Sequence, residues 1–354
     1  MRKRLKIAII PGDGVGPELM DQCCLILDEL NKKYNLKIEY NTLPYSSEYY
    51  LKNNIILPED RMEEIKKDYH TMIMGPLGDS RIPDAIHART MINNIRQYYN
   101  LNSAIQHVTY YHDNILPLKE IPEDNFDFYI FRENIEGFNL HFVKNSPKAQ
   151  YLNISDDSNI YTRSNLEKFL NSSFKYGQRL NKKKIFLVLK KYYFPKTNKL
   201  WSNVFEKVAE DYPDIETRII STEMTIYYLL NNPALFDILI APDVFADQLM
   251  TLGTFLMGGF GMSFYLNYGT ESLPVFRILH KPAHKYKNTG QINPIGTIRA
   301  LQHMLDHFNM KKSARVIDHS IRELFKANKA TIDLGGLLGI QETVDHILDS
   351  IDKA

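Results

Sequence analysis

The sequence predicts an α/β fold, because short apolar runs of strand character alternate with segments of helical periodicity along most of the chain. The clearest unit comes first, with a β-branched run at residues 6–10, a glycine turn at 11–14 and a helix at 17–30. The helix places apolar side chains at the helical spacing, at Leu19, Cys23, Leu27 and Leu30. This strand–turn–helix unit predicts a layered sheet that is covered by helices.

Further strands and helices continue the alternation. Strands are expected at residues 37–40, 71–74, 126–131, 184–189, 216–220 and 237–240, and helices at 58–67, 164–180, 201–209 and 224–230. The last hundred residues are mainly helical by pattern, and clusters of Asn, Ser, Asp and Pro predict an excursion or arm at 139–160. Without repeats or a Gly/Ser linker, any domain boundary is expected to be a compact crossover.

Length and composition narrow the class of protein. A chain of 354 residues favours about two domains or one large α/β unit. The 43 basic residues balance the 42 acidic ones, so no nucleic acid partner is expected. No apolar run approaches the roughly 20 residues of a membrane helix, so no membrane partner is expected either. The two cysteines, Cys23 and Cys24, are adjacent and poorly placed for a disulfide, which favours a reducing, cytoplasmic location.

The glycine turn admits two interpretations. Glycines after a strand suit a loop whose N–H groups bind a dinucleotide phosphate, but the spacing Gly12-Asp-Gly-Val-Gly16 departs from the Rossmann pattern, and a purely structural turn explains it equally well. The wider string Ile9-Ile-Pro-Gly-Asp-Gly-Val-Gly-Pro-Glu18 resembles the opening of the isocitrate and 3-isopropylmalate dehydrogenase family. These enzymes are metal-dependent β-decarboxylating dehydrogenases, and their fold is not Rossmann.

The resemblance continues in order along almost the whole chain. It includes Gly75-Pro-Leu-Gly-Asp-Ser-Arg81, Phe131-Arg-Glu-Asn-Ile-Glu-Gly137, Tyr161-Thr-Arg163, Asn232-Pro233, His280, Asn293-Pro294 and Asp333-Leu-Gly-Gly336. It implies two α/β domains with the active-site cleft between them. Residues 1–101 plus 256–354 would form a large cofactor-side domain, and 102–255 a small domain with the dimer interface and the arm. The expected assembly is a homodimer with shared active sites.

The resemblance also implies roles for individual side chains. Arg96 and Arg132 match two of the three arginines that bind the substrate in this family, and the third position is Gln106. Lys190 matches the lysine that the neighbouring subunit donates as the base, although an ordinary exposed lysine is the alternative interpretation. Asn139 stands where the family has a tyrosine that acts as the acid. Because an amide has no proton to give at neutral pH, protonation would require water or a group such as Tyr110 or Tyr111.

The same resemblance implies a metal site whose ligands differ from those of the family. The family supplies three aspartates to Mg²⁺ or Mn²⁺, one of them from the neighbouring subunit, and Glu223, Asp247 and Thr251 occupy those positions here. Asp243 adds a carboxylate one helical turn before Asp247 and is a further candidate ligand.

The cofactor loop runs from His280 to Asn293, and with Gly75 it carries the residues that match the family's cofactor site. The pair Lys285-Tyr286 is typical of members that use NADP, because a cation suits the 2′-phosphate, whereas members that use NAD tend to carry an aspartate. NADP is therefore favoured over NAD. Two further features of NADP-type enzymes, a tyrosine and an arginine, are replaced by Ile332 and Gly336, and Arg277 replaces an acidic residue before the histidine.

Substrate choice depends on one predicted helix. Arg89 and Thr90 stand where isopropylmalate enzymes carry an acidic residue and an apolar run. A cation with a hydroxyl favours an anionic γ-group, so isocitrate or homoisocitrate fits better than isopropylmalate. Gln106 removes part of the expected carboxylate clamp, which leaves an altered acid open.

Two functional hypotheses follow. The first is an NAD(P)- and metal-dependent dehydrogenase of a 2-hydroxy acid. The second is a catalytically degenerate paralogue that acts as a regulatory or scaffolding subunit, because Asn139, Thr251 and Gln106 alter three separate functions. The retention of Lys190, Arg132 and Asp247 argues for the enzyme.

Overall fold

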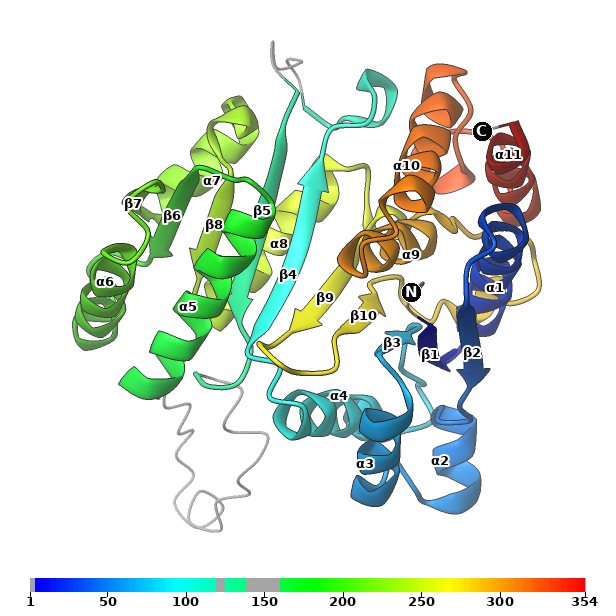
Figure 1. The fold of residues 1–354 in the computed structure, drawn as a ribbon, viewed down its shortest axis with the longest axis horizontal. Coiled ribbons are helices and arrows are strands. Elements are labelled where there is room, and N and C mark those ends of the chain that lie inside the picture. The colour runs from blue at the N-terminus through cyan, green and yellow to red at the C-terminus, as the bar shows by residue number, and fades with distance from the viewer. Residues whose placement is uncertain (1–3, 119–124, 138–159, 354) are drawn as a thin grey trace.

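The structure, a computed structural model, describes residues 4–118, 125–137 and 160–353 (Figure 1). Asn139 and nearly all of the predicted arm lie outside these residues. Within them the chain is a mixed α/β fold in which helices cover both faces of one sheet (Figure 1). The predicted fold class is confirmed.

The strands of the described chain form one ten-stranded sheet. They are β1 (Leu5–Ile10), β2 (Ile38–Thr42), β3 (Thr71–Met74), β4 (Ser103–Thr109), β5 (Asp127–Glu133), β6 (Lys184–Leu189), β7 (Glu216–Ser221), β8 (Ile238–Ala241), β9 (Phe264–Tyr268) and β10 (Val275–Ile278). Their order across the sheet is β2-β1-β3-β10-β9-β4-β5-β8-β6-β7. Every strand that the sequence predicts is present, with ends shifted by one or two residues.

Three strands were not predicted, namely β4, β9 and β10. The last two precede the helices of the final hundred residues, a region that is mainly helical as predicted. Both are short, with five and four residues, and β10 carries an arginine at its third position. Each is hydrogen-bonded to a neighbour on both sides, so pairing and burial stabilise them where local propensity is weak.

Strand direction divides the sheet into two parallel blocks. The strands β2, β1, β3 and β10 are mutually parallel, as are β5, β8, β6 and β7. Between the blocks, β9 is antiparallel to β10 and to β4, and β4 is antiparallel to β5. All strands of the predicted large domain lie from β2 to β9, and all those of the small domain from β4 to β7. The division into two domains stays a prediction, since the sheet is continuous across it.

The helices surround this sheet (Figure 1). They are α1 (Gly16–Tyr34), α2 (Ser47–Asn53), α3 (Glu59–Asp68), α4 (Ile86–Tyr98), α5 (Arg163–Arg179), α6 (Pro195–Ala209), α7 (Thr222–Asn231), α8 (Asp243–Leu256), α9 (Ile295–His307), α10 (Lys311–Lys326) and α11 (Ile340–Lys353). The apolar positions predicted on α1 are all fully buried. Cys23 and Cys24 are free thiols. None of the described helices is long and apolar enough to cross a membrane.

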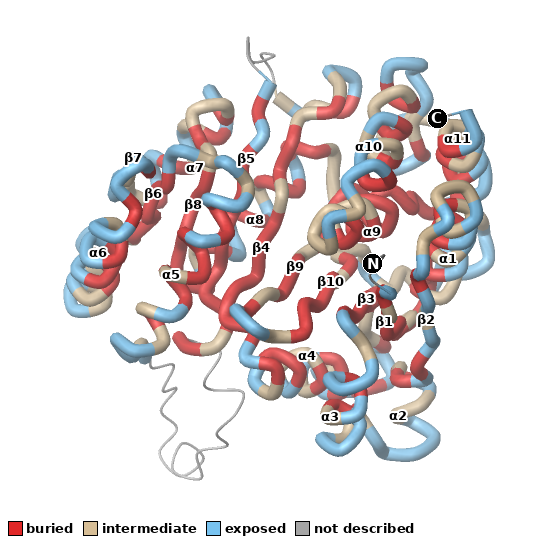
Figure 2. Tube along the Cα trace, viewed as in Figure 1, coloured by how far each residue is buried: buried red, intermediate tan, exposed pale blue. Residues whose placement is uncertain are grey.

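Two helices on one face of the sheet position the candidate site. Met91 and Ile95 of α4 pack with Met74 and Val275 of the strands below. Farther along the same face α8 crosses β4 and β5, where a Cβ on Gly253 would lie 2.7 Å from a Val108 methyl carbon. The opposite face is covered by α5 and α9. Figure 2 shows the buried strands between helices that are exposed on their outer sides.

Candidate active site

Three loops meet at the carboxyl ends of β1, β3 and β10. The amide of Asp13 donates to the carbonyl of Pro76 at 2.7 Å, and the amide of Val15 donates to the carbonyl of Pro282 at 2.9 Å. Gly14 has a φ of +59°, and a Cβ there would lie 1.9 Å from the Pro282 oxygen. Gly75 is equally confined, since its Cβ would lie 1.9 Å from the carbonyl oxygen of Pro11. The glycines of the motif therefore bring three backbones together.

Asp13, inside the glycine turn, has a structural role that the sequence did not indicate. Its carboxylate is buried and accepts hydrogen bonds from the amide and hydroxyl of Ser47, each at 2.6 Å. It also accepts from the amide of Gly78 at 2.7 Å. Asp13 thus connects the turn after β1 to the start of α2 and to the loop after β3.

The predicted cofactor residues lie on the loop that follows β10. Lys285 and Tyr286 are exposed, with the Lys285 ammonium 4.7 Å from the centre of the Tyr286 ring. His280 is partly exposed and its Nδ1 lies 2.7 Å from the carbonyl oxygen of Lys281. Asn293 is buried, donates to Asp333 and accepts from the first amide of α9. Asn293 therefore anchors the loop, whereas the side chains of His280, Lys285 and Tyr286 are accessible to solvent.

The predicted substrate arginines lie in one group of charged side chains. Arg96 comes from α4 and Arg132 from the end of β5, and they are 7% and 6% exposed. Arg132 forms an ion pair with Asp247 of α8 and donates to Asn134 at 3.3 Å. Burial opposes the charge on Arg132, but the attraction of Asp247 outweighs it and raises the pKa of the guanidinium. The structure thus brings together Arg96, Arg132 and Asp247, which lie on three different elements, and Arg132 and Asp247 are 115 positions apart in the sequence.

Two more residues join this group and were not assigned to the substrate by sequence reasoning. Arg277 of β10 is paired in register with Tyr265 of β9. Burial lowers the pKa of Arg96, and the charges of Arg132 and Arg277 lower it further, which identifies the three guanidinium groups as electrostatic neighbours. Burial raises the pKa of Tyr265 to about 12, with Asp247 adding to the shift. The substitution of an acidic family residue by Arg277 was the one sequence signal. Tyr265 gave none.

We name these five side chains, Arg96, Arg132, Tyr265, Asp247 and Arg277, the arginine cluster. Each of its three arginines has an Nε that is buried without a hydrogen-bond partner among the described residues. Buried donors in that state are costly unless a ligand satisfies them. The arrangement is therefore suited to bind an anion with several acceptor oxygens.

The other predicted substrate residues differ in placement. Arg89 is exposed and Thr90 partly exposed on α4, about two helical turns before Arg96. Gln106 is fully buried, and its amide donates to Thr254 of α8 at 2.8 Å. Gln106 therefore joins β4 to α8, and its contribution to substrate binding stays a prediction.

The predicted base and one predicted metal ligand contact each other. The ammonium of Lys190, just after β6, donates to Glu223 at the start of α7 and lowers the pKa of that carboxyl group. Lys190 also lies 5.2 Å from the centre of the Tyr193 ring. No described contact links this pair to Asp247, so a single chain does not bring the proposed base and ligands together.

The metal residues support the same conclusion. Within the described residues, no group of three or more His, Cys, Asp or Glu side chains is arranged to hold a metal ion. Asp243 is buried at the start of α8 and accepts from the amide of Val244. Thr251 donates its hydroxyl to the carbonyl of Asp247 at 2.8 Å. Asp247, whose side chain is 53% exposed, is the carboxylate of this helix that is open to a metal ion.

The structure does not identify the group that would act as the catalytic acid. Asn139 lies outside the described residues. The hydroxyl of Tyr110 donates to Asp113, and Tyr111 is buried between Arg299 and Arg322, so neither belongs to the arginine cluster. The structure gives no support to these two tyrosines as proton donors.

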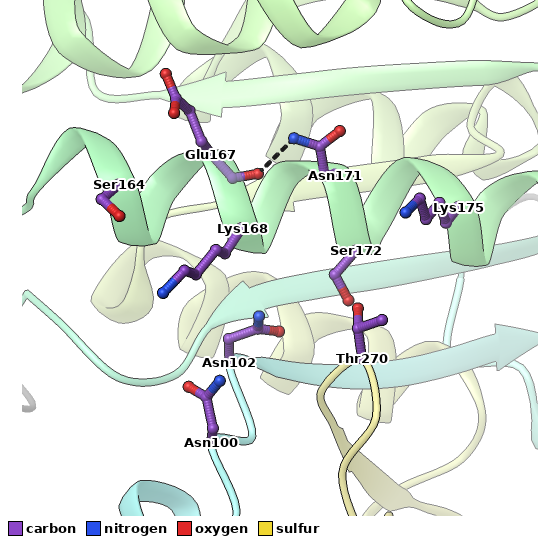
Figure 3. A pocket seen from close by; sticks show the side chains of 9 residues that line it. All are labelled: Asn100, Asn102, Ser164, Glu167, Lys168, Asn171, Ser172, Lys175 and Thr270. Atoms are coloured by element: carbon purple, nitrogen blue, oxygen red, sulfur yellow. Dashed lines mark hydrogen bonds between the residues drawn. The ribbon is translucent and has the colours of Figure 1, made fainter.

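A polar surface pocket of about 390 Å³ lies elsewhere, between α5, the segment before β4 and the turn between β9 and β10 (Figure 3). Asn102 and Thr270 face Ser172 and Lys168 of α5 across it (Figure 3). None of the residues predicted for substrate, cofactor or metal lines this pocket.

Comparison with known proteins agrees with the motifs. The sequence model of the family described as isocitrate/isopropylmalate dehydrogenase matches residues 6–349. A probable tartrate dehydrogenase/decarboxylase of Agrobacterium vitis is 26% identical over 353 residues, covering 99% of this chain and 98% of the relative. A 3-isopropylmalate dehydrogenase of Archaeoglobus fulgidus is 26% identical over 352 residues, covering 98% and 99%.

The fold is also shared with a solved structure. The crystal structure of isocitrate dehydrogenase from Methylococcus capsulatus superposes with a TM-score of 0.80 at 23% identity, covering 98% of this chain and 99% of that one. A family match across nearly the whole length, relatives of matching length and a shared fold lead to one conclusion. The chain is a divergent member of the isocitrate/isopropylmalate dehydrogenase family.

Proposed function

We propose that the protein is an NAD(P)- and divalent-metal-dependent dehydrogenase that oxidises, with decarboxylation, a 2-hydroxy acid of the isocitrate, homoisocitrate or isopropylmalate type. The observation that carries this proposal is the arginine cluster, in which buried Nε donors of Arg96 and Arg132 lack partners beside Asp247. Carboxylates of the acid satisfy those donors, and a guanidinium binds a carboxylate with two parallel hydrogen bonds. Among the described residues, no contact favours a purely scaffolding role.

The proposed active site is shared between two chains. Lys190 and Glu223 would enter the partner's site, where Lys190 takes the hydroxyl proton and Glu223 joins Asp247 as a ligand. Exposed apolar side chains on α7 and α8 support a homodimer, because their burial would stabilise it. These side chains are Met224, Tyr227, Leu230, Val244 and Phe255.

Metal and cofactor supply the remaining chemistry. A bound Mg²⁺ or Mn²⁺ supplies Lewis-acid polarisation of the substrate oxygens, and Asp247 suits either ion as a hard oxygen ligand. NAD(P), when bound, would supply the hydride acceptor. Lys285, exposed beside Tyr286, favours NADP through its 2′-phosphate. A titration in which NAD binds as tightly as NADP would contradict this preference.

The test is a cofactor-reduction assay on purified protein with Mn²⁺, using NAD and NADP with isocitrate, homoisocitrate, isopropylmalate, malate and tartrate. We expect turnover in wild type and none in Lys190→Ala. The matched control is Lys191→Ala, which changes the exposed neighbouring lysine. A folded dimer that is silent with every acid and both cofactors would count against the proposed function.

Metal binding has its own test. We expect Mn²⁺ to raise the melting temperature of wild type and not that of Asp247→Ala, because binding to the native state stabilises it. Asp345→Ala, on distant α11, serves as the control. An unchanged shift in Asp247→Ala would remove Asp247 from the metal site.

A further inference from the structure

The charges of the arginine cluster do not balance. Arg96, Arg132 and Arg277 contribute three guanidinium groups, and the carboxylates near them are Asp247, which forms an ion pair with Arg132, and Asp243, whose charge also acts on Arg132. Burying an uncompensated charge is unfavourable, and each of the three has a buried Nε with no partner among the described residues. The cluster therefore favours an anionic ligand with acceptor oxygens for all three guanidinium groups.

The register of the sheet shows how Arg277 reaches this group. Arg277 is paired with Tyr265, and two residues farther along β9 Asn267 is paired with Ala104 of β4, which is itself paired with Arg132. Residues paired across a sheet, and those two apart on a strand, share a face. Arg277 and Arg132 thus extend from the same face, displaced by three strand spacings, about 14 Å, across the sheet and by two residues, about 7 Å, along it. The small side chain of Ala104 lies between them.

The third positive charge of the cluster is therefore on β10 and not at position 106 of β4. At position 106 the side chain is Gln106, directed at Thr254 beneath α8 and without a positive charge. Arg277 supplies a guanidinium from β10, on the other side of β9, where the family usually has an acid. This exchange reverses the charge at position 277 and moves the site that can accept a carboxylate.

Resting on the proposed function, we propose that Arg277 determines specificity by binding a third carboxylate of the hydroxy acid, so that the substrate class is a tricarboxylate. Arg96 and Arg132 bind the two carboxylates shared with smaller acids. Tyr265 lies opposite Arg277 in the strand register. With its pKa raised to about 12, Tyr265 keeps its proton and can donate it in a hydrogen bond to the same carboxylate.

The alternative ligand for Arg277 is a cofactor phosphate, since the cofactor loop begins three residues later, at His280. The neighbours of Arg277 favour the acid. Burial lowers its pKa, and the charged groups that act on it are Tyr265, Arg132 and Asp247, which all belong to the arginine cluster. The predicted phosphate cation, Lys285, is exposed and lies on the loop itself.

The test measures binding without turnover. Isothermal titration in EDTA, without cofactor, compares isocitrate, homoisocitrate and the non-oxidisable propane-1,2,3-tricarboxylate with malate and tartrate. In wild type we expect tricarboxylates to bind about 10- to 100-fold more tightly than dicarboxylates, as a charged hydrogen-bonded pair provides. In Arg277→Met we expect this preference to vanish while malate affinity is unchanged.

Control variants separate a local effect from misfolding. Arg277→Lys keeps the charge and is expected to retain part of the preference. Tyr265→Phe removes only the second donor and is expected to weaken tricarboxylates alone. Arg179→Met removes an exposed arginine that donates to the carbonyl of His307 on the opposite face, and is expected to change nothing.

Several results would overturn the proposal. These are equal losses for malate and tricarboxylates in Arg277→Met, no loss for any acid, a wild type without preference, or a loss confined to NADPH in a parallel titration. The proposed function is judged separately. Tight binding of tricarboxylates without any cofactor reduction would refute the proposed function and leave the role of Arg277 standing. Turnover of dicarboxylates that is unchanged in Arg277→Met would support the proposed function and refute the role of Arg277.

Discussion

Glu133, in the motif that also carries Arg132, is a buried carboxyl group whose charge is disfavoured. It is 2% exposed and accepts hydrogen bonds from the amides of Ile135 and Glu136. Burial raises its pKa from 4.5 to about 7, with Asp243 and Glu136 adding to the effect. In the unfolded chain it ionises at lower pH, so it reduces the free energy of unfolding as the pH rises from about 4.5 to 7.

We therefore predict that Glu133→Gln is stabilised relative to wild type above pH 7, by up to about 3 kcal/mol. The amide keeps an oxygen acceptor for the two backbone N–H groups and cannot ionise. Urea denaturation of both proteins from pH 5 to 8 measures the difference, which should grow with pH. A difference that is constant over this range would show that Glu133 does not titrate as described.

Among the elements, α9 is held on β4 by neutral histidines. His303 of α9 lies 2.9 Å from His107 of β4, and His107 is bonded in turn to Asp127. Burial lowers the pKa of both histidines, and each is further lowered by the charge of Arg299. The unfolded chain binds these protons more readily, so the stability that they provide is present above about pH 6.5 and lost as the pH falls.

Replacing one histidine should weaken this acid sensitivity. His303→Phe cannot be protonated and retains ring packing against Phe264, whose centroid is 4.8 Å away. We expect the variant to lose less stability than wild type between pH 7 and 5.5, measured by urea denaturation. His319→Phe, on neighbouring α10, is the control. Parallel pH profiles for wild type and His303→Phe would exclude His303 as a titrating group.

At the scale of the whole molecule, dimerisation through α7 and α8 is testable. Leu230 is 46% exposed on α7, so Leu230→Asp should not disturb the core but should oppose burial in an interface. We expect a monomer by sedimentation, with melting behaviour of a folded chain. Leu25, also 46% exposed but on α1, gives the matched control Leu25→Asp, which should remain dimeric. Equal assembly of both variants would place the interface elsewhere.

Shared active sites make a separate prediction. Lys190→Ala and Arg96→Met should each be inactive, because each lacks one part of every site. If the two parts come from different chains, half of a randomly reassorted mixture is heterodimer with one intact site, giving about a quarter of wild-type activity. Unmixed variants are the control. If the mixture stays inactive after the chains have reassorted, Lys190 and Arg96 belong to the active site of the same chain.

Sequence alone predicted the fold class and the family. These follow from patterns of adjacent residues, such as helical spacing and colinear motifs. It did not predict β9 and β10, because their stability comes from hydrogen bonds to strands far away in the chain. The place of Tyr265 depends on that pairing, and so it could not be predicted either.

The pairing of β3 with β10 also affects how the chain is made. Met72 is hydrogen-bonded in register with Val275, so one edge of β3 has no neighbour until about 200 more residues have been synthesised. At 5 to 20 residues per second a ribosome needs roughly 10 to 40 seconds for that length. During this interval an apolar strand edge is open to other chains. The nascent protein is therefore expected to depend on chaperones until the β9–β10 hairpin emerges and completes the sheet.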